Sequence, residues 1–318
     1  MASRRVLILF SGPYHRPDGL AAFLTRFGID PVLVDNDPSN GGGTAHDLRR
    51  RSFFDDLLRR CHAGEFMAVF TAPPCSTFSV ARLFSPTDGG ESGPPPVRDR
   101  ANIHGLPNVP PRHVQELRIA NLLVRRTVAL IYAASQAGAE FSIENPADRG
   151  DPDSPHFLDA RHGPLWLLDE IRTLAKYTGA SSYTFPMCAF GSKRQKYTTL
   201  LSSPRLASLL EPLTTLRCTH THHQPVGSAR DENGNWISAS TAAYPPDFNL
   251  FVARCIASLV IPMNKLAPDT WGSDGRPGPT GMTVFRRGRN VVGCGYPVTS
   301  WEQTLARVYP ALEDAGRE

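Results

Sequence analysis

The sequence lacks the cysteine patterns that mark disulfide-rich or zinc-ribbon proteins. Its six cysteines include no CxxC pair and follow no regular spacing. A chain of 318 residues buries enough apolar surface to fold without disulfide bonds. We therefore expect reduced cysteines and no metal cofactor.

Long apolar runs are absent as well. No segment approaches the ~20 apolar residues that cross a bilayer, and the first ten residues, MASRRVLILF, lack the apolar stretch of a secretion signal. We expect no membrane partner, a monomer, and an intracellular location: the cytoplasm or nucleoid of a prokaryote or virus-infected cell, or a eukaryotic nucleus.

Neither sign of charge prevails. The chain holds 34 Lys and Arg against 30 Asp and Glu, a formal net charge of +4. This balance permits a polyanionic partner such as nucleic acid without requiring one. The 41% hydrophobic content suffices for one large core.

Short apolar runs alternate with helical patterns along most of the chain. Strands are expected at residues 4–10, 30–34, 66–72, 139–143, 183–188 and 197–202. Helices are expected at residues 18–28, with Asp18 as cap and Gly28 as stop, and at 52–61, 113–138, 165–177 and 247–260. This alternation predicts an α/β protein with a doubly wound, mostly parallel, Rossmann-like sheet.

In such sheets, ligands and catalytic groups gather where the parallel strands end. Cys75 follows Pro73-Pro74 at one expected strand end. Two prolines form a rigid turn that presents the thiol in a fixed direction, and a nearby cation can convert the thiol to a thiolate. A lone cysteine is more often a small buried hydrophobe, but this placement favours a nucleophile.

Glu144 follows another expected strand, directly before Asn145-Pro146. A partly desolvated carboxyl group there can stay protonated and donate to a ring nitrogen. The alternative is a surface glutamate, which the rigid Asn-Pro turn argues against. Cys75 and Glu144 form the pair that pyrimidine chemistry needs: a thiolate adds to carbon 6 of cytosine, an acid at N3 stabilises the charge, and carbon 5 then attacks an electrophilic methyl group.

The segments around both residues resemble motifs of the cytosine-5 DNA methyltransferases. The family's Pro-Pro-Cys motif, with its polar stretch and Phe-Ser, is similar to residues 73–79, PPCSTFS, and its Glu-Asn-Val motif is similar to residues 144–146, ENP. The resemblance covers roughly residues 4–260. It implies a methyltransferase-type fold and methyl transfer from S-adenosyl-L-methionine to carbon 5 of a flipped cytosine in DNA.

The resemblance also implies a pocket for S-adenosyl-L-methionine. The family's Phe-x-Gly-x-Gly loop is similar to residues 10–14, FSGPY, which keep only the first glycine. Asp35 stands where the family binds the ribose and Asp47 where it meets the adenine amino group, although helix capping or solvation is an even alternative for each. The expected cofactor residues are Phe10, Ser11, Gly12, Pro13, Asp35, Asn36, Asp47, Leu48, Pro73 and Ala243.

Residues 191–196, GSKRQK, resemble the family's Gln-x-Arg region, which holds the flipped base. Arg194 and Lys196 are therefore grouped with Cys75 and Glu144 as catalytic residues. The arginine-rich loop after Cys75 is expected to close over the site and contact phosphates, or else to be a plain surface loop. The expected nucleic-acid contacts are Ser79, Arg82, Arg98, Arg100, Asn145, Gln195, Arg217 and His220.

Four regions follow from the resemblance: a catalytic domain at 1–200, a short target-recognition region at 201–241, a helix at 242–264 that returns to the pocket, and a C-terminal extension of unknown role at 265–318. The target-recognition region contains residues 218–223, CTHTHH. This spacing matches no standard zinc pattern, so polar groups that face DNA are expected there in place of a metal site.

Three other functions stay open. The same chemistry could act on RNA or on a free cytosine nucleotide. The altered glycine loop and the absence of the family's Gly-Asn pair near residues 242–246 would also suit a catalytically silent nucleic-acid-binding relative. The same departures leave room for a donor that transfers a group larger than methyl.

Overall fold

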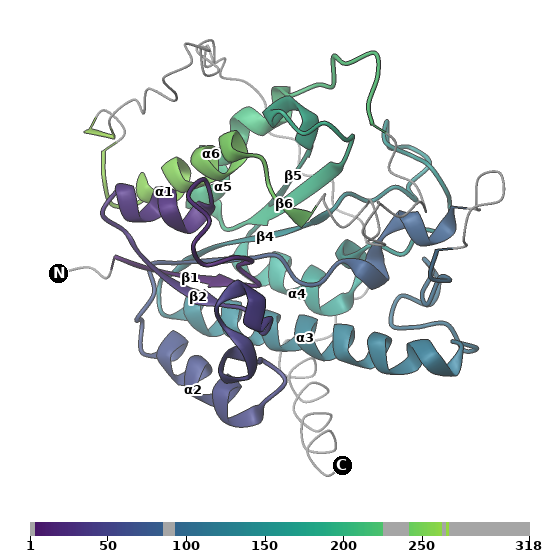
Figure 1. Ribbon diagram of the computed structural model, residues 1–318, viewed down its shortest axis with the longest axis horizontal. Helices are drawn as coiled ribbons and strands as arrows, with labels where there is room; N and C mark the ends of the chain where they lie inside the picture. Colours follow the sequence, from purple (N-terminus) through teal and green to yellow (C-terminus); the bar gives the residue numbers. More distant parts are fainter. Residues whose placement is uncertain (1–3, 85–92, 225–241, 263–264, 267–318) are drawn as a thin grey trace.

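A six-stranded mixed β-sheet forms the centre of the protein in the computed structural model, which describes residues 4–84, 93–224, 242–262 and 265–266 (Figure 1). The strand order across the sheet is β2-β1-β3-β4-β6-β5. The strands are β1 (Arg5–Leu9), β2 (Asp30–Val34), β3 (Ala68–Thr71), β4 (Glu140–Pro146), β5 (Ser181–Pro186) and β6 (Tyr197–Ser202).

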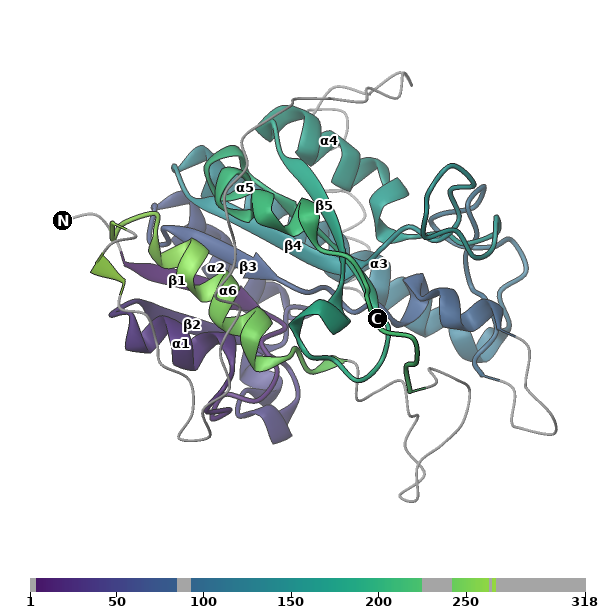
Figure 2. The same ribbon diagram turned by 90° about the horizontal axis from the view of Figure 1, so that it is seen from above.

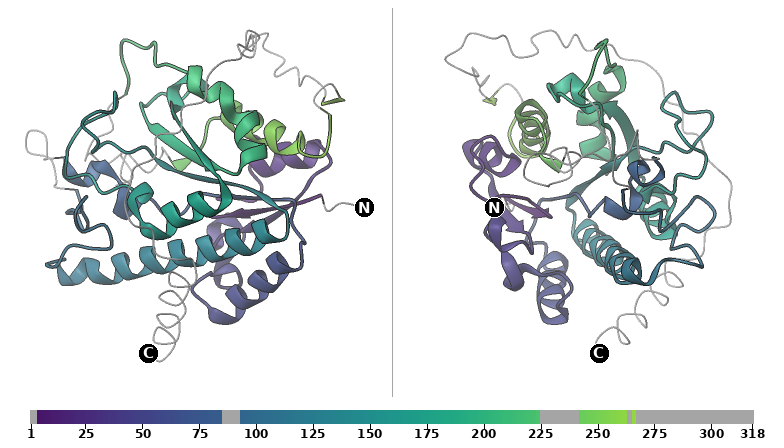
Figure 3. Two further views of the ribbon diagram at one scale, coloured as in Figure 1. Left: turned by 180° about the vertical axis from the view of Figure 1, so that it is seen from behind. Right: turned by 45° about the vertical axis from the view of Figure 1, so that its right-hand side comes forward.

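Helices cover both faces of this sheet, as Figures 1 and 2 show. One face packs against α1 (Leu20–Arg26), α5 (Pro204–Leu210) and α6 (Pro246–Ala257), and the other against α2 (Arg51–His62), α3 (Pro111–Gln136) and α4 (Asp169–Thr178). The long helix α3 runs along the back of the sheet in Figure 3. Each face has its own hydrophobic cluster, and alternate residues of β1 enter opposite clusters because side chains alternate along a strand.

The direction of β6 matters most for the position of the site. Strands β2, β1, β3 and β4 are parallel, whereas β6 runs antiparallel to both β4 and β5. Pro146, at the end of β4, therefore pairs with Thr198, near the start of β6. Residues that precede β6 lie at the edge of the sheet where the parallel strands end, and that is where ligands gather in such folds.

The α/β class and the mostly parallel sheet predicted from the sequence are confirmed. Three details were wrong. Asp18 does not cap α1, because Gly19 occupies that position and Asp18 pairs with Arg16. Strand β4 does not stop before Glu144 but continues through Pro146, because β6 pairs with these residues. Cys188 lies in a 3-10 turn, Met187–Phe190, beyond the end of β5.

Only part of the predicted target-recognition region lies among the described residues. Its first part, residues 204–210, forms α5, which packs onto the sheet with Leu206 and Leu210 nearly fully buried. Residues 225–241 of that region, and residues 267–318 of the predicted C-terminal extension, lie outside the described residues. Within the described part of the chain, no helix is both long and apolar enough to cross a membrane.

Candidate active site

A cavity of about 540 Å³ opens at the sheet edge where β1, β3 and β4 end. This volume is within the range of small-molecule sites. Its lining includes the loop after β1, the start of α1, the end of β2, the Pro-Pro-Cys turn and the segment that leads into α6, together with Glu144 on β4 and Lys196 just before β6. Among the residues predicted from the sequence, those that line it are Phe10, Ser11, Gly12, Pro13, Asp35, Pro73, Cys75, Glu144, Lys196 and Ala243.

Cys75 is half-buried and begins a short 3-10 turn, Ser76–Phe78, directly after Pro73-Pro74. Burial raises the pKa of its thiol above the ordinary value of 9.0 and nearby Glu144 raises it further, while the cation of Lys196 lowers it. The net shift is upward. The thiol is therefore mostly protonated at neutral pH in the free protein, and Lys196 is the group that favours its ionisation.

The Pro-Pro-Cys turn is fixed to the sheet by Asn145. The Nδ2 of Asn145 donates a hydrogen bond of 2.9 Å to the carbonyl oxygen of Pro73. The Asn145 side chain is only 1% exposed, so it offers no surface to DNA in this structure. Its hydrogen bond holds the Pro-Pro-Cys turn against β4, and the nucleic-acid contact predicted for it stays a prediction.

Glu144 lies in the cavity with both carboxylate oxygens occupied. Lys196 Nζ donates to Oε1 at 3.3 Å, and the hydroxyl of Tyr244 donates to Oε2 at 2.6 Å. Glu144 is 4% exposed. Because side chains alternate along β4, Glu144 and Asn145 point to opposite faces: Glu144 toward the face that carries α6 and Tyr244, and Asn145 toward the Pro-Pro-Cys turn.

Glu144 raises the pKa values of the two groups that donate to it, Lys196 and Tyr244. Burial opposes a charge on Lys196, but attraction to Glu144 and Cys75 outweighs it, so the pKa of Lys196 is raised and its ammonium form is favoured. Burial and the negative groups nearby raise the pKa of Tyr244 well above 10, which keeps its hydroxyl as a donor. Around the Glu144 carboxyl group, the cavity thus holds the thiol of Cys75, the ammonium group of Lys196 and the neutral hydroxyl of Tyr244.

Tyr244 is the functional candidate that the sequence analysis missed. It is 100 residues from Glu144, in the segment that was expected to return to the pocket. Two contacts fix that segment over α1: Arg16 donates to the carbonyl of Tyr244 at 2.8 Å, and Asn249 donates to the carbonyl of Asp18 at 2.9 Å. A tyrosine directly before Pro245-Pro246, at a helix start, was the available signal.

The loop after β1 has an unusual backbone. Phe10 has a φ of 57°, a left-handed conformation that is uncommon for a bulky side chain, and Gly12 has a φ of 67°. The amide of Gly12 donates to Asp35 Oδ2 at 2.9 Å, so this carboxylate fixes the loop. At the position of the family's second glycine, Tyr14 donates its amide to Asn40 and its hydroxyl to Leu33, which ties the loop to the segment after β2.

Four predicted residues do not line the cavity. Asn36 is exposed beside it. The carboxylate of Asp47 accepts hydrogen bonds from two guanidinium nitrogens of Arg49. Leu48 is a core residue that is 2% exposed. Arg194 lines a neighbouring hollow of about 510 Å³ with Arg16 and Lys193. Of the three candidates in the GSKRQK segment, Lys196 is the one beside Glu144.

The arginines after Cys75 hold their own loop together. Arg82 donates to the carbonyls of Ser76 and Pro95 and pairs with Glu116. Arg98 is 3% exposed, lies 3.8 Å from the centre of the Phe78 ring, and donates to Thr77. The predicted phosphate contacts are untested for both, and their burial gives them a structural role.

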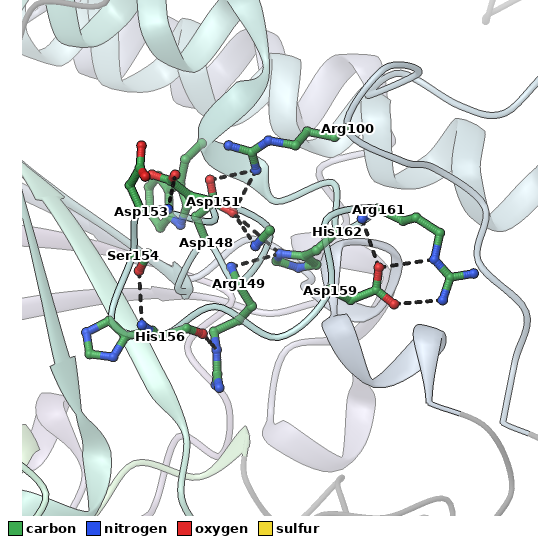
Figure 4. A network of polar contacts seen from close by, with 12 residues as sticks. Arg100, Asp148, Arg149, Asp151, Asp153, Ser154, His156, Asp159, Arg161 and His162 are labelled. Atoms are coloured by element: carbon green, nitrogen blue, oxygen red, sulfur yellow. Dashed lines mark hydrogen bonds and ion pairs between the residues drawn. The ribbon is translucent and has the colours of Figure 1, made fainter.

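Arg100 closes the same loop onto the segment after β4, as Figure 4 shows. Its guanidinium donates to both oxygens of Asp148 at 2.8 and 2.9 Å. His162 accepts from the amide of Arg149 at Nδ1 and contacts the carbonyl of Phe78 at 2.8 Å through Nε2, which assigns the proton to Nε2. The Pro-Pro-Cys turn is thus braced by two loops.

The remaining predicted nucleic-acid contacts lie at or near the surface. Gln195, Arg217 and His220 are exposed, and Ser79 is half-buried, with its hydroxyl accepting from the amide of Ala81 at 3.2 Å. Ser79 begins the turn Val80–Leu83. No DNA contact is tested for these four residues.

Comparison with known proteins does not identify this site. No family model matches the chain, and no curated protein matches it either. The functional argument therefore depends on the residues of the cavity and on the motifs that contain them.

Proposed function

We propose that the protein transfers a methyl group from S-adenosyl-L-methionine to carbon 5 of cytosine in DNA. The observation that carries the proposal is the meeting of Cys75, Glu144 and Lys196 in one cavity. A nucleophile and a carboxyl group on neighbouring strand ends are what addition to a pyrimidine requires. The PPCSTFS and ENP segments supply both groups in the order that the methyltransferase resemblance implies.

Each residue has a defined part in this chemistry. The Cys75 thiolate forms a bond to carbon 6, and the ring accepts the electron pair displaced from the double bond between carbons 5 and 6. The Glu144 carboxyl group, in its protonated form, donates its proton to N3 and neutralises the negative charge that develops there. Lys196 favours the thiolate before addition. Tyr244 and Lys196 hold the Glu144 carboxyl group in place through both oxygens. After methylation, a base removes the carbon 5 proton, and the bond between Cys75 and carbon 6 breaks to release the product.

The residues near β1 and β2 suit the methyl donor. Asp35 and the loop of residues 11–13 line the polar side of the cavity, and Leu33 and Phe70 add apolar surface. S-adenosyl-L-methionine would supply the electrophilic methyl group there. Adding a Cβ to Gly12 would meet nothing within 4 Å, so its backbone is open to a ligand that approaches closely.

A nucleic-acid substrate is favoured by the basic hollow beside the cavity. Arg16 lines both spaces, and Lys193 and Arg194 line the hollow. Cations next to a pocket for one base can bind the phosphates that flank a flipped nucleotide. A free nucleotide would need fewer such contacts.

The direct test is methyl transfer from labelled S-adenosyl-L-methionine to DNA, to RNA of the same sequence and to free cytidine monophosphate. The product base is identified by mass spectrometry after hydrolysis. We expect 5-methylcytosine in DNA with wild-type protein, and a loss of more than about 10³-fold with Glu144→Gln or Cys75→Ala. If only RNA or only the nucleotide is methylated, that molecule and not DNA is the substrate. No transfer to any substrate, despite tight DNA binding, would contradict an enzymatic function.

A further inference from the structure

Four potential metal ligands meet in a second cluster, outside the cavity described above. Cys188 lies in the turn after β5, and Cys218, His220 and His223 lie in the segment that follows α5 and its 3-10 continuation, Glu211–Thr215. One ligand atom from each residue lies within 4.8 Å of all the others. These residues come from segments thirty positions apart in the sequence, and folding brings them together.

The distances inside the cluster are close to those of a tetrahedral metal site. Cys218 Sγ is 3.4 Å from His223 Nε2 and 4.0 Å from His220 Nδ1. Zinc bonds to sulfur of about 2.3 Å and to nitrogen of about 2.0–2.1 Å place neighbouring donors roughly 3.3–3.8 Å apart in a tetrahedron. Small side-chain rotations would bring all four donors onto one ion.

We propose that Cys188, Cys218, His220 and His223 bind a structural Zn²⁺ ion. Two thiolates and two neutral imidazoles form a complete tetrahedral set, which leaves no position for a substrate. The two thiolates balance the charge of the ion. Sulfur and imidazole together favour zinc over the hard cations Mg²⁺ and Ca²⁺, which take oxygen ligands.

The surroundings of the cluster fit a structural role. Cys188 is buried, and Cys218 and His223 are half-buried, which restricts access to the ion. Just beyond His223, the backbone amide of Gln224 donates to the carbonyl oxygen of Lys193 at 3.1 Å, and the backbones of Gln224 and Arg194 form an isolated parallel β-bridge. The ion would therefore fasten residues 218–224 to the segment that carries Lys196.

This inference revises the expectation of no metal from the sequence. There, only the CTHTHH segment was visible, with four possible ligands, Cys218, His220, His222 and His223, of unusual spacing. Cys188, the ligand from outside this segment, belonged to a predicted strand. Its position at the end of β5 becomes significant because β5 pairs with β6, and residues 193–194 just before β6 bind the segment at Gln224.

The test measures bound zinc in the full chain, purified without a histidine tag. We expect about one zinc per chain by inductively coupled plasma mass spectrometry, and less than about one tenth of that in the double variant Cys188→Ser, Cys218→Ser. His222→Ala is the matched control, because His222 lies in the same segment but outside the ligand set. Zinc content at background in wild type, or equal in wild type and the double variant, would overturn the proposal.

A second readout keeps the test valid if the double variant does not fold. Wild-type protein stripped by a chelator is titrated with Co²⁺, and we expect sulfur-to-cobalt charge transfer and the intense visible bands of a tetrahedral site, saturating at one equivalent. Weak octahedral bands alone would overturn the proposal. The Cys75→Ala variant should keep its zinc, so failure of the methyl-transfer proposal and failure of the zinc proposal are distinguishable.

Discussion

Lys196 is the residue on which the reactivity of the cavity most depends. Its ammonium group contacts Glu144 at 3.3 Å and is the cation that lowers the pKa of Cys75 against burial. Neither role was visible in the sequence, where Arg194, Gln195 and Lys196 were equal candidates. Side chains alternate near the start of β6, so Lys196 shares the face of Leu200, which pairs with Glu144 in the sheet.

The alkylation rate of Cys75 tests this role. The pKa of Cys75 is raised, so its reactive thiolate fraction should increase about tenfold per pH unit between pH 7 and pH 9, without a plateau. Lys196→Met removes the favourable cation and should slow the reaction about tenfold at each pH. Iodoacetamide labelling, followed by peptide mass spectrometry, measures Cys75 separately from the other cysteines.

Lys176→Met is the control for that measurement, because Lys176 is exposed on α4 and does not line the cavity. It should label at the wild-type rate. A plateau below pH 9 would contradict the raised pKa of Cys75. Equal rates for Lys196→Met and Lys176→Met would show that Lys196 does not act on the thiol.

At the scale of elements, strand β4 organises the site. Its last residues supply Glu144 to the cavity and Asn145 to the Pro-Pro-Cys turn, and pairing with β6 keeps both in extended backbone. From the sequence, this strand was predicted to end at Ile143 because Asn-Pro usually marks a turn. The residues of β4 contain no signal that β6 lies beside them in the antiparallel direction and pairs with Glu144–Pro146.

Replacing Asn145 tests the connection between β4 and the nucleophile. Asn145→Ala removes the hydrogen bond from Asn145 Nδ2 and leaves the Pro73 carbonyl without that donor. We expect a loss of about 1–3 kcal/mol in the free energy of unfolding, measured with urea, and slower methyl transfer by the folded variant. Asn102→Ala, at an exposed position, is the control. Unchanged activity in Asn145→Ala would mean that the turn holds its shape without Asn145.

At the scale of the whole molecule, the sequence predicted the class of the fold and the meeting of Cys75 and Glu144 at one edge of the sheet better than the completion of the site. Alternating strands and helices indicated the α/β sheet, and strand ends indicated Cys75 and Glu144. The contacts that complete the cavity connect distant segments: Tyr244 joins Glu144 across 100 residues. A pattern of neighbouring residues can mark Tyr244 as a candidate, but it does not indicate which distant side chain Tyr244 contacts.

Local sequence patterns also do not show which of the predicted cofactor residues line the cavity. Asp47 and Leu48 follow β2 in the expected order, but the chain turns away from the cavity after Asn40, and Leu48 enters the core. Adding a Cβ to Gly42 would place it 1.9 Å from the carbonyl oxygen of Asp35, so this close turn requires glycine. The order of residues along the chain therefore indicated the segment after β2, and the backbone geometry of that segment determines which of its residues line the cavity.

The measurement that tests the central claim most directly is covalent trapping on DNA that contains 5-fluorocytosine. Fluorine at carbon 5 cannot leave as the proton does, so the bond between Cys75 and carbon 6 persists after methyl transfer. In the presence of S-adenosyl-L-methionine, we predict a protein–DNA adduct on a denaturing gel, attached at Cys75 by peptide mass spectrometry and absent in Cys75→Ala. An adduct that survives in Cys75→Ala, or no adduct with wild-type protein that binds the DNA, would contradict the account.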